Sequence, residues 1–256
     1  MKIKNVAKKV LTDNLSEPLN GATAAKVDIN AGDGNLTIDQ LTTGGQLTDG
    51  EQVLASGTLQ YLENQGLPTR SVNTINGQAS LTLKASDTGR PWFIFPWAAC
   101  NGATEWEIHI NPNVQSEITA HSEGGNVKLN LAGMAVTRVS ADTGGGNMDV
   151  VLPDNAANLS VIAKTGAGIV AVEIGSGTTG SNSVNANSGA GNVVVCIPSG
   201  MAARIHATSG LGKTIMDSRF SKTDSNTYQS PDYEGASDKV EITVHSGAGN
   251  VRVSTR

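Results

Sequence analysis

A short glycine-rich cassette recurs along this chain and constrains its fold more than any other feature. Each copy approximates the order small hydroxyl residue, glycine, any residue, glycine, asparagine, apolar residue. The second glycine of each copy serves as an anchor, at Gly34, Gly125, Gly146, Gly168, Gly191, Gly212 and Gly249. From the second anchor onward the steps are 21, 22, 23, 21 and 37 residues. Self-similarity at spacings of about 20 to 50 residues is the signature of a repeat architecture.

Apolar and polar residues alternate on both sides of each anchor. Seven positions before the anchors stand only apolar β-branched residues: Val27, Ile118, Val139, Val161, Val184, Ile205 and Ile242. Five positions before the anchor, five of the seven copies have alanine, and apolar residues return two and four positions after nearly every anchor. Period-two alternation around a glycine turn predicts a strand, a tight turn and a second strand in each repeat.

One such unit cannot bury its apolar row alone, whereas stacked units can. We therefore predict an all-β fold, a β-solenoid or β-helix-like stack of strand–turn–strand rungs of about 21–23 residues, each rising about 4.8 Å. The inward alanines predict a narrow interior. The glycines are expected to supply positive φ angles in the turns, and the Ser or Thr three positions before most anchors is expected to make hydrogen bonds within the turn.

The pattern also divides the chain. Residues 1–19 are expected to be an N-terminal tail or cap, and residues 20–256 a single repetitive domain. Residues 118–216 are predicted to form the regular rungs and 240–256 the last rung, with an irregular loop over 217–239. Residues 42–117 fit the pattern poorly and are predicted to be degenerate rungs or hairpins. The 91-residue step from Gly34 to Gly125 leaves room for about four rungs.

Four segments point to a family. They are VSADTGGGNMDVVLP at 139–153, ITVHSGAGNVRV at 242–253, WEIHINP at 106–112 and LAGM at 131–134. Over about residues 20–256 the chain resembles the toast-rack family, bacterial adhesin-like domains related to the C-terminal domains of cell-envelope-stress regulators. The resemblance implies a β-solenoid-like domain, usually outside the cytoplasm, with no established enzymatic activity and no catalytic residues to carry over.

Charge and hydropathy exclude some partners and leave the location open. The chain has 18 Lys and Arg against 23 Asp and Glu, a net charge of −5, which argues against nucleic acid as a partner. No apolar run approaches the roughly 20 residues of a transmembrane helix. The first 20 residues lack a continuous apolar signal segment, so a cytoplasmic location stays open beside the envelope location that the family suggests.

The repeated glycines and the histidines predict no cofactor or metal. A dinucleotide fingerprint requires a helix after the glycines, whereas each glycine pair precedes another alternating strand. His121 and His245 occupy the same repeat position but lie five cassettes apart, about 24 Å along a sequentially ordered stack. They are therefore not expected to share a metal ion. Cys100 and Cys196 lie in apolar surroundings and are expected to be buried thiols, with a single disulfide as the alternative.

Acidic residues near two cassettes leave a hydrolytic function open. Asp28, Asp33 and Asp39 surround the first cassette, and Asp142 and Asp149 surround the third. Glycoside hydrolysis uses two carboxyl groups about 5–10 Å apart. Solvent-facing Asp is common in turns, however, so polysaccharide-active chemistry is the weakest hypothesis.

One segment departs sharply from the composition of the rest, in which aromatic residues are only 4%. It holds the candidate platform residues Trp92, Phe93, Phe95, Trp97 and Trp106. One interpretation is an aromatic platform for a protein or polysaccharide partner, because aromatic residues dominate binding hot spots. The other is a plug that covers a flank or end of the stack, since each ring buries about 150–250 Å².

The leading functional hypothesis is a non-enzymatic, adhesin-like binding or scaffold domain associated with the bacterial cell envelope, with a protein or polysaccharide partner. A self-assembling structural protein is the second hypothesis, because the exposed strand edges of an open stack pair between chains by their edges or ends. A polysaccharide-active enzyme is the third.

Overall fold

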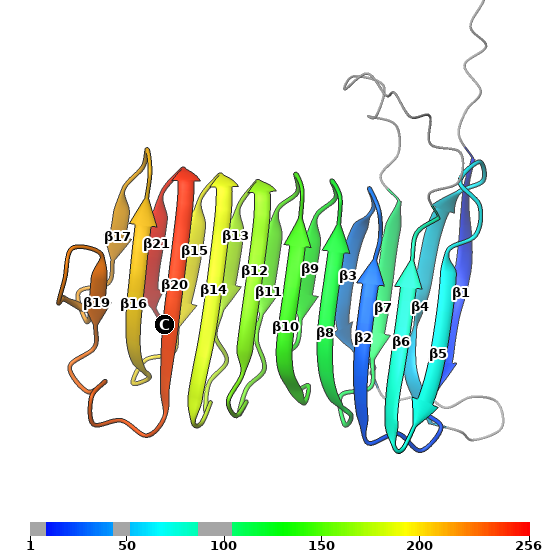
Figure 1. Ribbon diagram of the computed structural model, residues 1–256, viewed down its shortest axis with the longest axis horizontal. Coiled ribbons are helices and arrows are strands. Elements are labelled where there is room, and N and C mark those ends of the chain that lie inside the picture. The colour runs from blue at the N-terminus through cyan, green and yellow to red at the C-terminus, as the bar shows by residue number, and fades with distance from the viewer. Residues whose placement is uncertain (1–8, 43–51, 87–103) are drawn as a thin grey trace, which may run out of the picture.

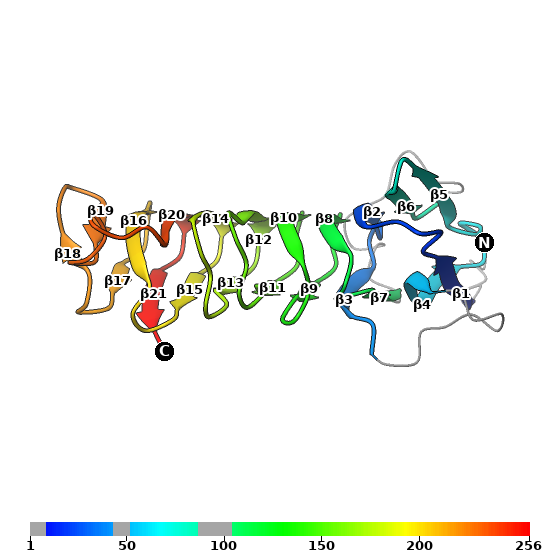
Figure 2. The ribbon, with the colours of Figure 1, turned by 90° about the horizontal axis from the view of Figure 1, so that it is seen from below.

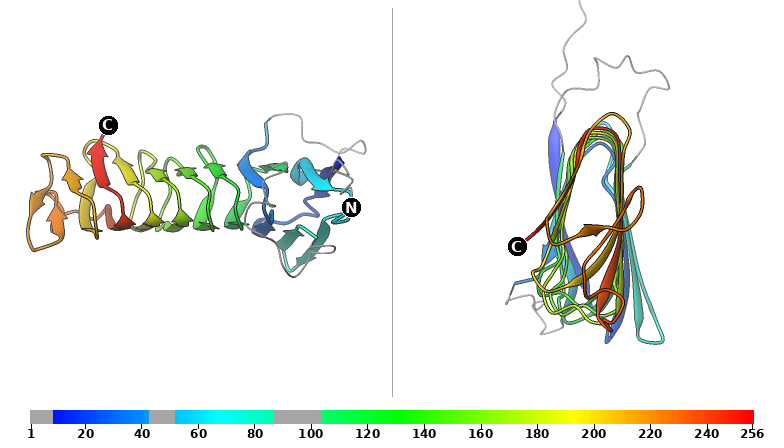
Figure 3. Two further views of the ribbon diagram at one scale, coloured as in Figure 1. Left: turned by 90° about the horizontal axis from the view of Figure 1, so that it is seen from above. Right: turned by 90° about the vertical axis from the view of Figure 1, so that its left-hand side faces the viewer.

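The structure is a computed structural model that describes residues 9–42, 52–86 and 104–256. Two long sheets lie face to face and form one flattened stack (Figures 1 and 2). Viewed along the stack, successive rungs superpose as narrow closed loops around a thin core (Figure 3). The predicted all-β, solenoid-like fold is therefore confirmed, and the described residues contain no helix.

Sheet A has ten strands and sheet B has eleven. In spatial order, sheet A consists of β1 (Val10–Pro18), β4 (Val53–Leu62), β7 (Glu105–Ile110), β3 (Asn35–Gln40), β9 (Val127–Asn130), β11 (Met148–Val151), β13 (Val170–Glu173), β15 (Val193–Ile197), β21 (Val251–Thr255) and β17 (Thr214–Met216). Sheet B consists of β18 (Ser221–Lys222), β19 (Thr227–Gln229), β16 (Ala202–Ser209), β20 (Lys239–Ala248), β14 (Ser181–Ala190), β12 (Ser160–Ala167), β10 (Val136–Thr143), β8 (Gln115–Ser122), β2 (Ala24–Asn30), β6 (Gln78–Lys84) and β5 (Thr69–Ile75).

The regular rungs pair in parallel with the repeat positions in register. Val139 of β10 lies between Ile118 of β8 and Val161 of β12. All three side chains are buried, as are the alanines two positions further along each strand. The apolar rows that alternate in the sequence therefore form the core between the sheets, and the polar rows between them face outward.

In six of the seven cassettes a hydroxyl residue joins its turn to the neighbouring rung. Ser122 Oγ accepts a hydrogen bond from the Gly125 amide at 2.8 Å and donates one to the Gly34 carbonyl at 2.9 Å. Thr143 donates in the same way to the Gly125 carbonyl at 2.7 Å. These buried hydroxyls confirm the predicted turn hydrogen bonding. Each cassette asparagine adds a second link, since Asn126 Oδ1 accepts from the Asn147 amide at 2.9 Å.

The anchor glycines are required mainly by the close approach of neighbouring rungs. A Cβ on Gly146 would lie 2.0 Å from the Gly125 carbonyl oxygen. The φ angles of Gly125 and Gly146 are not positive, unlike those of Gly168, Gly191 and Gly249. Our expectation that positive φ explains the glycines is therefore right at some anchors and incomplete at others, where backbone contact excludes any side chain.

The rungs do not stack in the order of the chain. β20–β21, the last rung in the sequence, lies between β14–β15 and β16–β17. At the other end β2–β3 lies directly beside β8–β9, so no rung separates these two cassettes in the stack. Within the 91-residue step, β6 and β7 pair in parallel with the opposite sides of β2 and β3. His121 and His245 are consequently four strands apart rather than five. That separation is about 19 Å, which is still too far for a shared metal ion.

The N-terminal end is assembled from segments that are not cassettes. β6 extends sheet B beside β2, and β5 pairs with β6 as an antiparallel hairpin. β7 extends sheet A beside β3, followed by the antiparallel strands β4 and β1. Residues 10–18, expected to be a tail or cap, form the outermost strand of sheet A. Arg70 of β5 lies 3.9 Å from Asp13 and Glu17 of β1, which links the outer strands of the two sheets.

Residues 217–238 cover the C-terminal end of the stack (Figure 1). β18 and β19 extend sheet B beyond β16, and Phe220 and Tyr233 of this segment are buried. Arg204 lies 4.4 Å from the centre of the Tyr233 ring, and burial raises the pKa of that tyrosine. The predicted irregular loop therefore contains two short strands and contributes side chains to the core.

Asp217 connects this C-terminal segment to β21, and we expect the connection to fail in acid. Its carboxylate accepts hydrogen bonds from the Arg219 amide at 3.0 Å and the Thr255 hydroxyl at 2.8 Å. These bonds, the Arg219 amide first, hold the pKa of Asp217 below its usual value of 3.8. The stabilisation is therefore complete above pH 3.8 and is lost as the pH falls below it. Hydrogen-exchange protection of residues 251–256, measured relative to an unfolded chain at each pH, should fall as the carboxylate is protonated. In the Asp217→Asn variant, protection of these residues should change little over the same pH range.

Candidate binding surfaces

The structure separates the residues of the predicted aromatic platform. Trp106 lies on β7, opposite Leu59 of β4, and is only 2% exposed. Its indole Nε1 donates a hydrogen bond to the Gln60 carbonyl at 2.9 Å. Trp106 is therefore a core residue that offers no surface to a ligand. Trp92, Phe93, Phe95 and Trp97 lie outside the described residues, so a platform formed by these four stays a prediction.

Two histidine–aspartate pairs occur on opposite outer faces of the stack. His121 and Asp142 occupy the same column on neighbouring strands of sheet B, with 2.5 Å between Nδ1 and Oδ1. His109 and Asp39 form an equivalent pair on sheet A, also at 2.5 Å. The sequence repeat already places His121 and Asp142 at equivalent positions, because each stands four residues before an anchor glycine. Among the described residues, no group of three His, Cys, Asp or Glu side chains is placed to hold a metal ion.

Four of the five carboxylates considered for hydrolysis are divided between the two sheets, and Asp33 is exposed in the turn between β2 and β3. Asp142 is on β10 of sheet B, and Asp149 is on β11 of sheet A. Both alternate with buried residues, so they project from opposite outer faces of the stack. Asp28 and Asp39 are divided between the sheets in the same way. Packed sheets lie about 10 Å apart, so each pair is separated by more than the roughly 5–10 Å that glycoside hydrolysis uses.

Cys196 differs from its predicted environment. It lies on β15 between the buried residues Val195 and Ile197, and its side chain faces outward from sheet A, half-buried. The apolar run around it led us to expect a core position, whereas strand alternation places it on the surface. The thiol is free. Cys100 lies outside the described residues.

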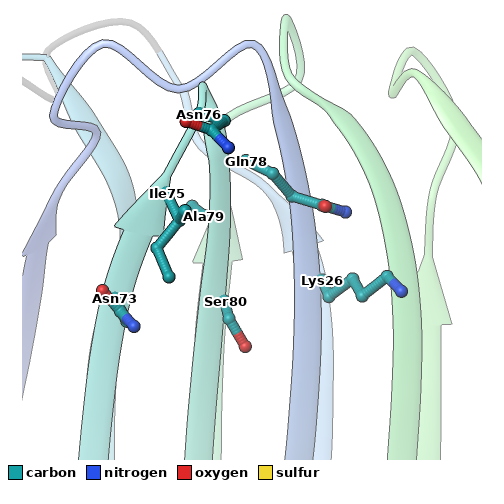
Figure 4. Close-up of a pocket in the computed structure, with 7 residues that line it drawn as sticks. All are labelled: Lys26, Asn73, Ile75, Asn76, Gln78, Ala79 and Ser80. Carbon is teal, nitrogen blue, oxygen red and sulfur yellow. The ribbon is translucent and has the colours of Figure 1, made fainter.

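A shallow pocket of about 320 Å³ lies on the outer face of sheet B near the β5–β6 turn. Its lining is formed by Lys26, Asn73, Ile75, Asn76, Gln78, Ala79 and Ser80. Figure 4 shows these side chains spread over three neighbouring strands, with amide, hydroxyl and ammonium groups around the apolar Ile75. The sequence did not indicate this pocket, because its residues come from the non-repetitive end of the chain. Its lining mixes polar groups with apolar surface from residues such as Ile75 and Ala79.

These features define a class: a repeat protein of two stacked sheets with a core filled by side chains, which presents its two outer faces and its ends to the surroundings. Residues 5–173 match the family model described as the N-terminal domain of toast_rack. Because this match spans more than half of the chain, the protein belongs to that family, which confirms the resemblance seen in the sequence. Residues 174–253 match a second model, described as cell wall-active antibiotics response LiaF, C-terminal.

The two matches meet between β13 and β14, but the stack is continuous there. β14 pairs in register with β12, and β15 pairs in register with β13. The two sequence families therefore occupy one uninterrupted pair of sheets. A search of the curated proteins finds no match.

Among solved structures, the chain resembles a candidate cell adhesion protein from Clostridium sporogenes. The two are 20% identical, with a TM-score of 0.68 over 97% of this chain and all of the other. At this identity the likeness establishes the fold alone. A candidate adhesin from Bacteroides fragilis is 12% identical and aligns over 96% of this chain and 97% of its own. Its TM-score of 0.31 is too low to establish a shared fold. No helix in the described part of the chain is long and apolar enough to cross a membrane.

Proposed function

We propose that the protein is a non-enzymatic, adhesin-like binding or scaffold domain associated with the bacterial cell envelope. The observation that carries the proposal is the continuous stack that joins a toast_rack match to a LiaF C-terminal match. The second of these families is named for a response to antibiotics that act on the cell wall. The Clostridium sporogenes protein of similar fold, described as a candidate cell adhesion protein, supports a role in contact rather than in catalysis.

The geometry of the described residues agrees with this role. The interior is closed by side chains such as Trp106 and Ile108, so it offers no channel for a substrate. Asp142 and Asp149 lie on opposite faces, and the described pocket is shallow. We propose that a polysaccharide or protein of the envelope binds at the surface, with the aromatic residues Trp92, Phe93, Phe95 and Trp97 as the candidate contact.

Tryptophan fluorescence tests the proposal because the buried and candidate contact residues can be separated. In a Trp106→Phe variant, the emission comes from Trp92 and Trp97 alone. We expect iodide to quench this emission and purified cell-wall polysaccharide to protect it. In the reciprocal control, which carries Trp92→Phe and Trp97→Phe, the emission of Trp106 should be blue-shifted and insensitive to both iodide and polysaccharide.

Two results would contradict the polysaccharide contact. One is emission of the Trp106→Phe variant that iodide does not reach, which would make the aromatic segment a plug. The other is quenching that polysaccharide leaves unchanged while the full chain also fails to sediment with isolated cell walls. Sedimentation with cell walls in the absence of tryptophan protection would move the contact to the outer faces of the sheets.

A further inference from the structure

The outer face of sheet A carries a row of side chains with a self-complementary charge pattern. Parallel pairing places Asp149, Ala171, Val194 and Arg252 side by side on β11, β13, β15 and β21. Asp149 and Arg252 are exposed, and the two apolar residues between them are half-buried. The row therefore reads acidic, apolar, apolar, basic across four neighbouring strands.

Other aliphatic side chains lie near this row on the outer face of sheet A. The next row on the same strands consists of Val151, Glu173, Cys196 and Ser254. Ile215 on the adjacent strand β17 is 39% exposed and lies beside Arg252. On sheet B, the outward residues of the matching rungs include Lys164, Asn185 and Asn187. On the same four strands of sheet A, aliphatic side chains lie among the charged residues Asp149, Glu173 and Arg252.

Asp149 and Arg252 do not satisfy each other within one chain. Three strand spacings separate them, which is about 14 Å. Within the part of the chain that the structure describes, neither has an ion-pair partner within 4.0 Å. Lys128 is next to Asp149 in the same row, on β9, and does not approach it to that distance.

We propose that this face binds a second copy of the chain through a two-fold axis that runs parallel to the strands and passes between β13 and β15. That axis reverses the strand order in the second copy. Asp149 then faces Arg252 of the partner subunit, Arg252 faces Asp149 of the partner subunit, and the apolar residues meet at the centre. A two-fold contact requires such a self-complementary surface, and the charge order provides it.

The shape of the stack permits this contact at the part of the sheet A face that lies nearer the glycine turns. The stack of regular rungs is straight (Figure 2), so two copies can lie along each other. The C-terminal Arg256 reaches Glu173 at 2.8 Å and covers part of the row that contains Cys196. The contact is therefore centred on the row from Asp149 to Arg252, which is closer to the glycine turns. This surface is distinct from the strand edges at the two ends.

Charge reversal tests the proposal with the full chain in sedimentation velocity experiments. We expect the unmodified protein to form dimers that dissociate on dilution. Asp149→Arg and Arg252→Asp should each place two like-charge pairs in the interface and raise the dimer dissociation constant by about a hundredfold or more. An equimolar mixture of the two variants should recover the dimer, because every contact in the mixed pair joins opposite charges.

Controls on the other face make the test specific. Asp28→Arg and Arg138→Asp introduce the same charge changes at exposed positions of sheet B, and both should leave dimerisation unchanged. The proposal is overturned if the unmodified protein stays monomeric at all concentrations. It is also overturned if the mixture of Asp149→Arg and Arg252→Asp stays monomeric, or if dimers persist in each variant alone. Polysaccharide binding is measured separately, so its failure does not affect this result.

Discussion

Gly146→Ala is expected to destabilise the protein severely. The added Cβ would lie 2.0 Å from the Gly125 carbonyl oxygen and 2.4 Å from its carbonyl carbon, both of which are backbone atoms. Relief would require neighbouring rungs to separate where Thr143 donates its hydrogen bond to the Gly125 carbonyl. We expect a loss of about 3 kcal/mol or more in the free energy of unfolding, measured by urea denaturation.

The adjacent glycine provides a matched control. Gly145 stands one position earlier in the same turn, and a Cβ there would meet no atom within 4 Å. Its φ angle is not positive, so alanine fits without backbone strain. Gly145→Ala should therefore change stability by less than about 0.5 kcal/mol. Equal effects at the two positions would mean that glycine is needed for flexibility of the turn rather than for contact between rungs.

The rung itself was predictable because its determinants are local. Within one rung, alternation fixes which residues face the core, and the hydroxyl and glycine positions fix the turn. The same reasoning places Trp106 correctly when it is applied strictly, because Trp106, Ile108 and Ile110 alternate with Glu105, Glu107 and His109 on β7. Grouping Trp106 with nearby aromatic residues by composition left this periodicity unused and placed a core residue among the candidate platform residues.

The order of the rungs was not predictable from the same pattern. Val184 of β14 meets Ile242 in the structure, but Ile205 has the same position and character in its own rung. Since every rung presents an equivalent apolar column, the columns do not specify which rung follows which. The only sequence features that indicate a change of order are the long steps of 91 and 37 residues between anchors. They coincide with the two places where the chain leaves the stack and returns to a position out of sequence.

Ile242→Asp tests this order and should have the largest effect of any substitution in the C-terminal rungs. Ile242 is fully buried between Val184 and Ile205, so the new carboxylate would lie in the core without a partner. A buried, unpaired charge costs about 3–5 kcal/mol. Because burial raises the pKa of a carboxyl group, the loss relative to the unmodified protein at the same pH should shrink as the pH falls.

The location of the damage distinguishes spatial order from chain order. β20 is the neighbour of both β14 and β16, so hydrogen exchange should lose protection on both strands. If the rungs followed the chain, β20 would be terminal, and β14 would keep its protection because β16 would cover it. Thr243→Asp, at the next residue, faces solvent and should change stability by less than about 0.5 kcal/mol. Protection retained in β14 in the Ile242→Asp variant would contradict the interleaved order of the last rungs.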